Sequence, residues 1–185
     1  YPVLKGACEF LLEQLVENGE GYLVTAPSIS PENKFFMGNA EELDALAEEM
    51  AAGSRCSSNH PKISAVTQAS TMDMSILREL FQNTIQAGNI LGEKKDLENK
   101  LKAVMQKFPP YKIGRYGQLL EWYEDYEECT PGMGHISHLY PVYPSSVINE
   151  EKTPELLEAA RKSLERRMLH EKKKSDCRVP GGFSD

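Results

Sequence analysis

The chain of 185 residues is long enough to form one domain with a hydrophobic core. Its composition, 40% hydrophobic and 26% charged, is typical of a globular protein, and its net charge of −7 argues against a nucleic-acid partner, because phosphate binding needs a basic face. No apolar run approaches the roughly 20 residues that a membrane span needs.

The first predicted element is a helix that begins near Pro2. Apolar residues recur at helical spacing over residues 4–16, and proline suits the first turn of a helix. The pair Asn18-Gly19 is typical of a helix end, so we expect the helix to stop there.

Residues 21–33 form a short apolar run that ends in a turn rich in serine and proline. Pro27 and Pro31 disfavour helix in the residue before each of them, so we expect ordered, extended chain here. The turn carries a single carboxylate, Glu32. Catalytic groups concentrate in loops on rigid scaffolds, but most loop glutamates are simply solvated, and the local residues leave both interpretations open.

Residues 37–68 are predicted to be a variable loop or insertion. Within them, residues 41–52 have the composition of a short acidic surface helix. Residues 53–68 are rich in serine and also contain asparagine and proline, which favours a loop.

Three further helices are predicted. Ser70 is a candidate N-cap with Asp73 three residues later, and Gly92 is a candidate end for that helix. The next helix runs over residues 96–108 and is stopped by two prolines. The last begins at residues 153–154, where threonine is a candidate cap and proline takes the first helical position.

Residues 111–150 are aromatic, polar and non-repetitive, which is more often typical of a functional segment than of a linker. The only strand candidate is the short run at residues 22–25. We therefore predict an all-α fold of four sizeable helices joined by loops, some of them long. Such an arrangement fits a helical toroid better than a tight bundle, whose loops are usually short.

The cysteines give no sign of a metal site. There are four, none in a Cys-x-x-Cys pair and none with histidines at metal spacing: Cys8, Cys56, Cys129 and Cys177. Their even number permits disulfides without requiring them, so the cysteines do not indicate in which cellular compartment the protein lies. The chain also opens on Tyr1-Pro2 without an initiator methionine, which indicates a piece of a longer protein.

Six blocks along the chain follow the order and spacing of one enzyme family. They are residues 1–7, 21–28 with 30–33, 71–74 with 78–81, 113–119 with 121–122, 135–139 with 143–144, and 153–156 with 159–161. In these blocks the chain resembles glycoside hydrolase family 95, the inverting α-L-fucosidases built on an (α/α)6 barrel. The resemblance covers nearly all of the chain except roughly residues 37–68. It implies that residues 1–185 are a single partial domain, a central slice of the catalytic barrel, and we expect the isolated chain to be inactive.

The resemblance places the general acid of the reaction on Glu32. Cleavage with inversion needs an acid that protonates the leaving oxygen and a base that activates water about 6.5–9.5 Å away. A loop that shields the carboxyl from water would favour its neutral, proton-donating form. The resemblance places the family's water-activating asparagine pair upstream of this segment, and no Asn-x-Asn occurs in the chain.

The resemblance also implies substrate-binding residues. His135 and His138 match a sugar-contacting histidine block, although either could instead be hydrogen-bonded inside a loop. Trp122 could form an apolar platform for a sugar face, with Gln118 and Glu121 bonding hydroxyls. The alternative for Trp122 is a place in the core.

The leading hypothesis is an exo-glycosidase that removes terminal α-linked fucose from a fucosylated oligosaccharide or glycan, without metal or cofactor, since acid and base are protein groups. A non-catalytic sugar-binding or interaction relative is the alternative, favoured by Met133-Gly134 where relatives usually carry His-Arg. The flanking sequence would separate the two. A helical-repeat scaffold would require internal repeats, and none is found. The resemblance slightly favours a secreted or extracytoplasmic location.

Overall fold

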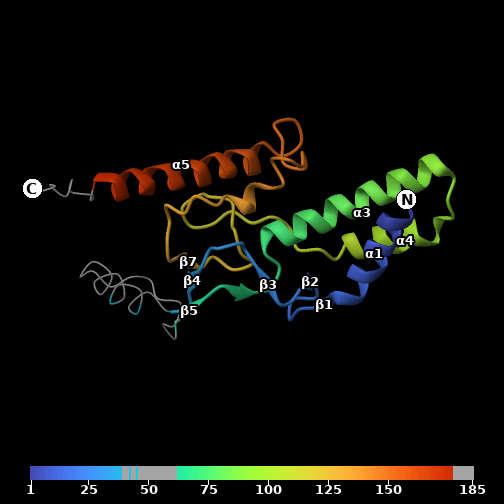
Figure 1. Ribbon diagram of the computed structural model, residues 1–185, viewed down its shortest axis with the longest axis horizontal. Coiled ribbons are helices and arrows are strands. Elements are labelled where there is room, and N and C mark those ends of the chain that lie inside the picture. Colours follow the sequence, from blue (N-terminus) through green and yellow to red (C-terminus); the bar gives the residue numbers. More distant parts are fainter. Residues whose placement is uncertain (39–41, 43–44, 46–61, 177–185) are drawn as a thin grey trace, which may run out of the picture.

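The computed structural model describes residues 1–38, 42, 45 and 62–176. Within these residues it contains four α-helices and seven strands of two or three residues, paired in three small antiparallel sheets (Figure 1). The prediction of an all-α fold forming part of a toroid is therefore wrong, because the fold is mixed. Strands this short carry too few residues to show an alternating pattern in the sequence. The acidic helix predicted at 41–52 lies almost entirely outside the described residues.

The N-terminal helix is shorter than predicted. Helix α1 spans Pro2–Gln14, and the chain then forms a hairpin of β1 (Leu15–Glu17) and β2 (Leu23–Thr25). The side-chain oxygen of Asn18 accepts two backbone hydrogen bonds within the connecting turn. An Asn-Gly pair between two apolar runs is also a hairpin signal, and here it makes a turn between strands instead of ending a helix.

The two central helices begin close to their predicted positions. Helix α3 spans Thr71–Leu91, and α4 spans Lys95–Met105. The Ser70 hydroxyl accepts the backbone N–H of Asp73 at 3.3 Å, and Gly92 ends α3 with a left-handed φ of 69°, so both predicted caps are confirmed.

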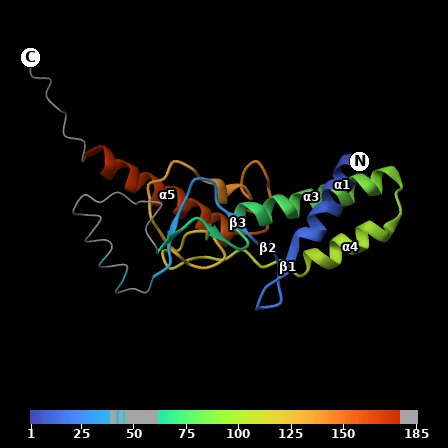
Figure 2. The same ribbon diagram turned by 60° about the horizontal axis from the view of Figure 1, so that its bottom comes forward.

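Helices α1, α3 and α4 lie side by side at one end of the molecule (Figures 1 and 2). Their apolar faces meet in one core cluster, together with residues of β2 and of the loops. Its buried members include Cys8, Val24, Met74, Leu77, Phe81, Leu101, Phe108 and Tyr123. This cluster anchors the N-terminus of α3, which is hydrogen-bonded to Ser28, just before the predicted Glu32 turn, and to the backbone carbonyl of Glu121.

Two small sheets surround the predicted Glu32 turn. Strand β3 (Ser28–Ile29) pairs with β6 (Val66–Thr67). Strand β4 (Phe35–Phe36) lies between β5 (Ile63–Ser64) and β7 (Glu127–Glu128). The end of the predicted variable segment 37–68 therefore contributes two strands, one to each of these sheets. The turn connects β3 to β4 and is held from both sides.

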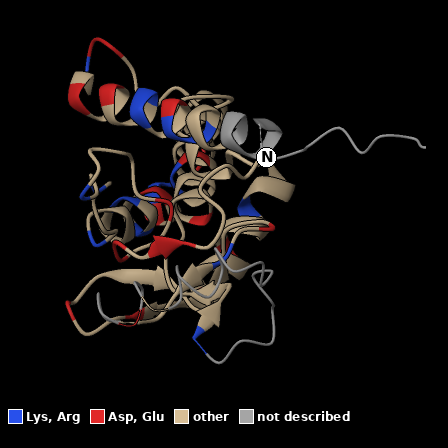
Figure 3. Cartoon of the chain, turned by 90° about the vertical axis from the view of Figure 1, so that its left-hand side faces the viewer, with Lys and Arg blue, Asp and Glu red and all other residues tan. Residues whose placement is uncertain are grey.

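Helix α5 (Pro154–Asp176) lies apart from the other helices and begins at the predicted proline (Figures 1 and 2). Acidic and basic residues are interspersed along it (Figure 3). It packs on the short 3-10 helix η1 (Ser137–Leu139) through a second core cluster: Leu119, Leu139, Ile148, Ala159 and Ala160. Two consecutive arginines of α5, Arg166 and Arg167, pair with the two glutamates of β7. Through them α5 is fixed to the sheet that borders the turn.

Candidate active site

Glu32 lies at the tip of a tight turn between β3 and β4. The backbone N–H of Asn33 donates to the carbonyl of Ser30 at 3.2 Å, with Pro31 and Glu32 in the middle. Glu32 has a left-handed φ of 57°, which is uncommon for a residue with a Cβ and costs energy. Ser30 and Asn33 are buried, whereas Glu32 is exposed. The turn thus presents the Glu32 carboxyl to the surface from a buried base.

The Glu32 carboxyl pairs with His135. Their Oε2 and Nε2 atoms are 2.8 Å apart, and the side chains are 72% and 49% exposed. Exposed pairs of this kind contribute little to stability, so this contact matters mainly for where it places an imidazole next to a carboxyl. Of the six predicted site residues, these two are brought together at the surface.

Glu121 is hydrogen-bonded to the base of the same turn. Its Oε1 accepts the Ser30 hydroxyl at 2.5 Å, and its Oε2 accepts the Asn33 side-chain amide at 2.9 Å. Nη2 of Arg167 also donates to Oε2, at 2.6 Å. The Glu121 side chain is only 3% exposed. A buried carboxylate needs such donors, and three of them hold this one in place.

Arg167 is shared between two carboxylates, those of the buried Glu121 and the half-buried Glu128. Its Nη1 donates to Glu128 at 2.5 Å and lies 3.4 and 3.2 Å from the carbonyls of Thr130 and Pro131. One guanidinium cannot balance both Glu121 and Glu128. Burial raises the pKa of Glu128 to about 7; Arg167 opposes this rise and the Glu121 charge adds to it.

His138 is buried in the same cluster. Its Nδ1 lies 3.5 Å from Glu121 Oε2 and makes no hydrogen bond within the part of the chain that the structure describes. Burial lowers the pKa of His138 to about 4; the Glu121 charge opposes the shift and Arg167 adds to it. The imidazole is therefore neutral at neutral pH. Its side chain is only 3% exposed, so a ligand at the surface cannot reach it in this structure.

These two shifts predict opposite effects of pH on stability. With the pKa of Glu128 raised from 4.5 to about 7, the folded protein binds more protons than the unfolded chain, so the free energy of unfolding falls as pH rises through that window. With the pKa of His138 lowered from 6.5 to about 4, the folded protein binds fewer, so the free energy of unfolding rises from about pH 4 to pH 6.5. Each effect is on the order of 3 kcal/mol. They largely cancel where they overlap.

Replacing Glu128 with glutamine should remove the fall in stability with rising pH that Glu128 causes, and leave the rise that His138 causes. We expect the free energy of unfolding of Glu128→Gln to increase by about 3 kcal/mol between pH 4 and pH 6.5, measured by urea titration at several pH values. The neighbouring Glu127→Gln is the matched control, because Glu127 pairs with Arg166 at a partly exposed position, and its profile should stay flat. A flat profile for both variants would contradict the assigned shifts.

Two other predicted residues lie in the packed interior. The Trp122 ring packs against Phe35 with ring centroids 5.0 Å apart and is 3% exposed. A sugar platform needs an open ring face, which Trp122 does not present here. Gln118 braces its own loop, accepting the Tyr116 backbone N–H at 3.0 Å and reaching Asp125 at 3.5 Å.

Arg167, Ser30 and Asn33 are not among the site residues predicted from the sequence. On an amphipathic helix, an arginine that turns inward has the same local pattern as one in solvent. The signal available for the other two was their position on either side of Pro31-Glu32, where small polar side chains commonly close a turn.

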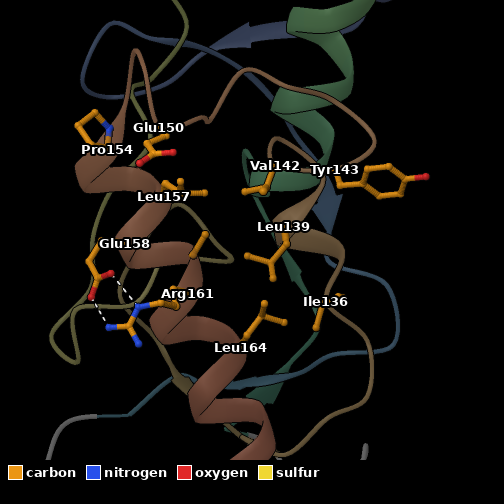
Figure 4. A pocket seen from close by; sticks show the side chains of 11 residues that line it. Ile136, Leu139, Val142, Tyr143, Glu150, Pro154, Leu157, Glu158, Arg161 and Leu164 are labelled. Atoms are coloured by element: carbon orange, nitrogen blue, oxygen red, sulfur yellow. Dashed lines mark hydrogen bonds and ion pairs between the residues drawn. The ribbon is translucent and has the colours of Figure 1, made fainter.

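An apolar groove of about 630 Å³ lies between the η1 segment and α5. Figure 4 shows Ile136, Leu139 and Val142 facing Leu157 and Leu164 of α5, while the Tyr143 ring points away. Sugar hydroxyls need polar partners, and the lining is mainly apolar. We assign no substrate to this groove.

The exposed pair can carry out proton transfer, because a carboxyl and an imidazole within hydrogen-bond distance can donate, accept or relay a proton. In residues 1–38 and 62–176, together with 42 and 45, no group of three or more His, Cys, Asp or Glu side chains is placed to hold a metal ion. No helix over the same residues combines the length and the apolar character needed to cross a bilayer.

Comparison with known proteins identifies the family. The Glycosyl hydrolase family 95 catalytic domain matches residues 1–177. The chain is 34% identical over 168 residues to alpha-L-fucosidase 2 of Arabidopsis thaliana, covering 90% of this chain and 17% of that protein. It is 29% identical over 156 residues to the probable alpha-fucosidase A of Aspergillus niger, covering 80% of this chain and 16% of that protein. It thus spans about a sixth of the length of these curated relatives. The chain belongs to the glycosyl hydrolase family 95 catalytic domains.

Proposed function

We propose that the full-length protein containing this chain is an inverting, exo-acting α-L-fucosidase that removes terminal α-linked fucose from oligosaccharides, with Glu32 as the general acid. Family membership and the names of the two relatives support the reaction class and the sugar. One observation supports the residue assignment above all: the exposed Glu32 carboxyl stands on a turn with a buried base, 2.8 Å from His135 Nε2.

The geometry suggests how the pair would act. Protonated Glu32 gives its proton to the glycosidic oxygen as the bond to the sugar breaks. The carboxylate left behind is negatively charged, and an N–H at Nε2 of His135 stabilises it by a charge-assisted hydrogen bond. A substrate that covers the pair excludes water, which favours the neutral form of a carboxyl before the transfer.

Inversion also requires a base on the opposite face of the sugar, about 6.5–9.5 Å from the acid. No residue of this chain is assigned that role. The family resemblance gives it to an asparagine pair upstream of this segment. The catalytic site of the proposal is therefore shared between this chain and the remainder of the full-length protein.

The test is an anomeric assay. The full-length protein is incubated with a trisaccharide that carries terminal α-linked L-fucose, and proton NMR follows the release of fucose before mutarotation. We expect the β anomer to appear first. A matched trisaccharide with terminal α-linked D-galactose controls for the sugar and should stay largely intact. Release of the α anomer first would contradict inversion, and binding without release would identify a non-catalytic sugar-binding relative.

A further inference from the structure

The Glu32 turn has a conformation that its own sequence does not favour. A left-handed φ at a glutamate costs energy and persists only where surrounding structure holds it. The backbone hydrogen bond from Asn33 to Ser30 closes the turn at 3.2 Å, which is near the long end for such a bond. The turn therefore depends on further ties, and both of its end residues are bound through their side chains to Glu121.

Glu121 holds the turn at both ends at once. Oε1 binds Ser30 and Oε2 binds Asn33, so the two oxygens of one carboxylate set the separation of the residues that flank Pro31-Glu32. Glu121 is held in turn by Arg167, whose side chain is 6% exposed and is fixed on its other side by Glu128. The support for Glu32 thus runs from α5 through two buried charged residues.

We propose that Glu121 is a positioning residue: it fixes the direction in which the turn presents the Glu32 carboxyl and does not itself bind sugar. Both Glu121 oxygens accept hydrogen bonds from protein donors and the residue is buried, so a substrate hydroxyl could reach the carboxylate only if the packing around it opened. Catalytic groups need supports of this kind, since a displacement of about 1 Å can cost about a hundredfold in rate. This inference rests on the proposed role of Glu32.

The experiment compares two substrates with the full-length protein. A fucosylated trisaccharide has a poor leaving group that must be protonated, whereas α-L-fucosyl fluoride releases fluoride with little help from an acid. If Glu121 positions the acid, Glu121→Gln should lower kcat on the trisaccharide by about 10–100-fold, with KM nearly unchanged, and lower kcat on the fluoride by less than about threefold. The double variant Glu32→Gln/Glu121→Gln should be no slower on the trisaccharide than Glu32→Gln alone.

Glu127→Gln is the matched control. It also removes a carboxylate from β7, but Glu127 pairs with Arg166 and not with Arg167, so it lies outside the contacts that run from Arg167 through Glu121 to the turn. It should change kcat on the trisaccharide and on the fluoride by the same factor. If Glu121→Gln does not fold, Ser30→Ala decides the question, because it removes a single hydrogen bond between Glu121 and the turn and leaves the Arg167 pair in place.

The outcomes separate the two proposals. Suppose that Glu32→Gln loses activity selectively on the trisaccharide, but Glu121→Gln, or Ser30→Ala in its place, lowers kcat equally on both substrates. The positioning role is then wrong and Glu32 remains the acid. If Glu32→Gln shows no selectivity between the substrates, the proposed acid is wrong and the positioning role falls with it. A loss confined to KM for Glu121→Gln would point to sugar binding and would overturn the positioning role.

Discussion

Replacing Glu32 with glutamine is expected to lower kcat/KM of the full-length protein on a fucosylated trisaccharide by about 10²–10⁴-fold. Glutamine keeps the shape and the polar contact to His135 but has no acidic proton to give to the leaving sugar. Because Glu32 is exposed and its neighbours carry the buried contacts of the turn, the substitution should leave the fold intact. Steady-state kinetics at the pH optimum measure the effect.

A matched substitution tests whether the loss belongs to this position. Glu124 is also an exposed glutamate on a loop. Glu124→Gln removes the same charge from the protein, and we expect it to change kcat/KM by less than about twofold, as surface substitutions usually do. Equal losses in the two variants would show that net charge, and not a proton donor at residue 32, governs the rate.

Replacing Arg167 with methionine is expected to lower the free energy of unfolding by about 3–5 kcal/mol. Arg167 is the cation that pairs with both Glu121 and Glu128, and methionine fills similar volume without a charge. The carboxylates of the buried Glu121 and the half-buried Glu128 are then left close together without that cation. Trp122 is the single tryptophan of the 185 residues and is buried. In a urea titration of the 185-residue chain, its fluorescence therefore reports unfolding.

The neighbouring Arg166 provides the control. It pairs with Glu127 at 3.0 Å, but both side chains are partly exposed to solvent. Arg166→Met should therefore cost no more than about 1 kcal/mol. If the two substitutions have similar effects, the buried cluster is not what fixes α5 to β7.

The features that the sequence could predict are those set by neighbouring residues. The cap formed by Ser70 and the end of α3 at Gly92 depend on side-chain and backbone geometry within one turn, so the local pattern was sufficient. The proline at the start of α5 is of the same kind. The Asn18-Gly19 pair shows the limit, because a helix end and a hairpin turn share this signal and the partner strand decides between them.

The strands could not be predicted because each is stabilised by a partner far along the chain. Phe35 and Phe36 of β4 pair with β5 and β7. The identity of these two residues does not indicate which distant segments they pair with. A class prediction that rested on periodicity therefore counted the helices and missed the sheets. The small sheets place the two strands that the Glu32 turn connects.

The candidate site shows the same difference between what local sequence indicates and what long-range packing decides. The resemblance directed attention to Glu32 and His135, and the structure places these two together. It also implied substrate-binding roles for Glu121, Trp122 and His138, which belong to the same matching blocks of sequence but are buried in the structure. Burial depends on long-range packing, so the pattern of residues could not distinguish a side chain that touches a ligand from one that supports its neighbour.

If Glu32 supplies a proton to the leaving group, its replacement should matter only for leaving groups that need one. The kcat/KM values of the wild-type full-length protein and of Glu32→Gln are measured on the fucosylated trisaccharide and on α-L-fucosyl fluoride. We expect kcat/KM to fall by about 10²–10⁴-fold on the trisaccharide and by less than about tenfold on the fluoride, because fluoride leaves without needing an acid. An equal loss on both substrates would show that Glu32 is not the proton donor.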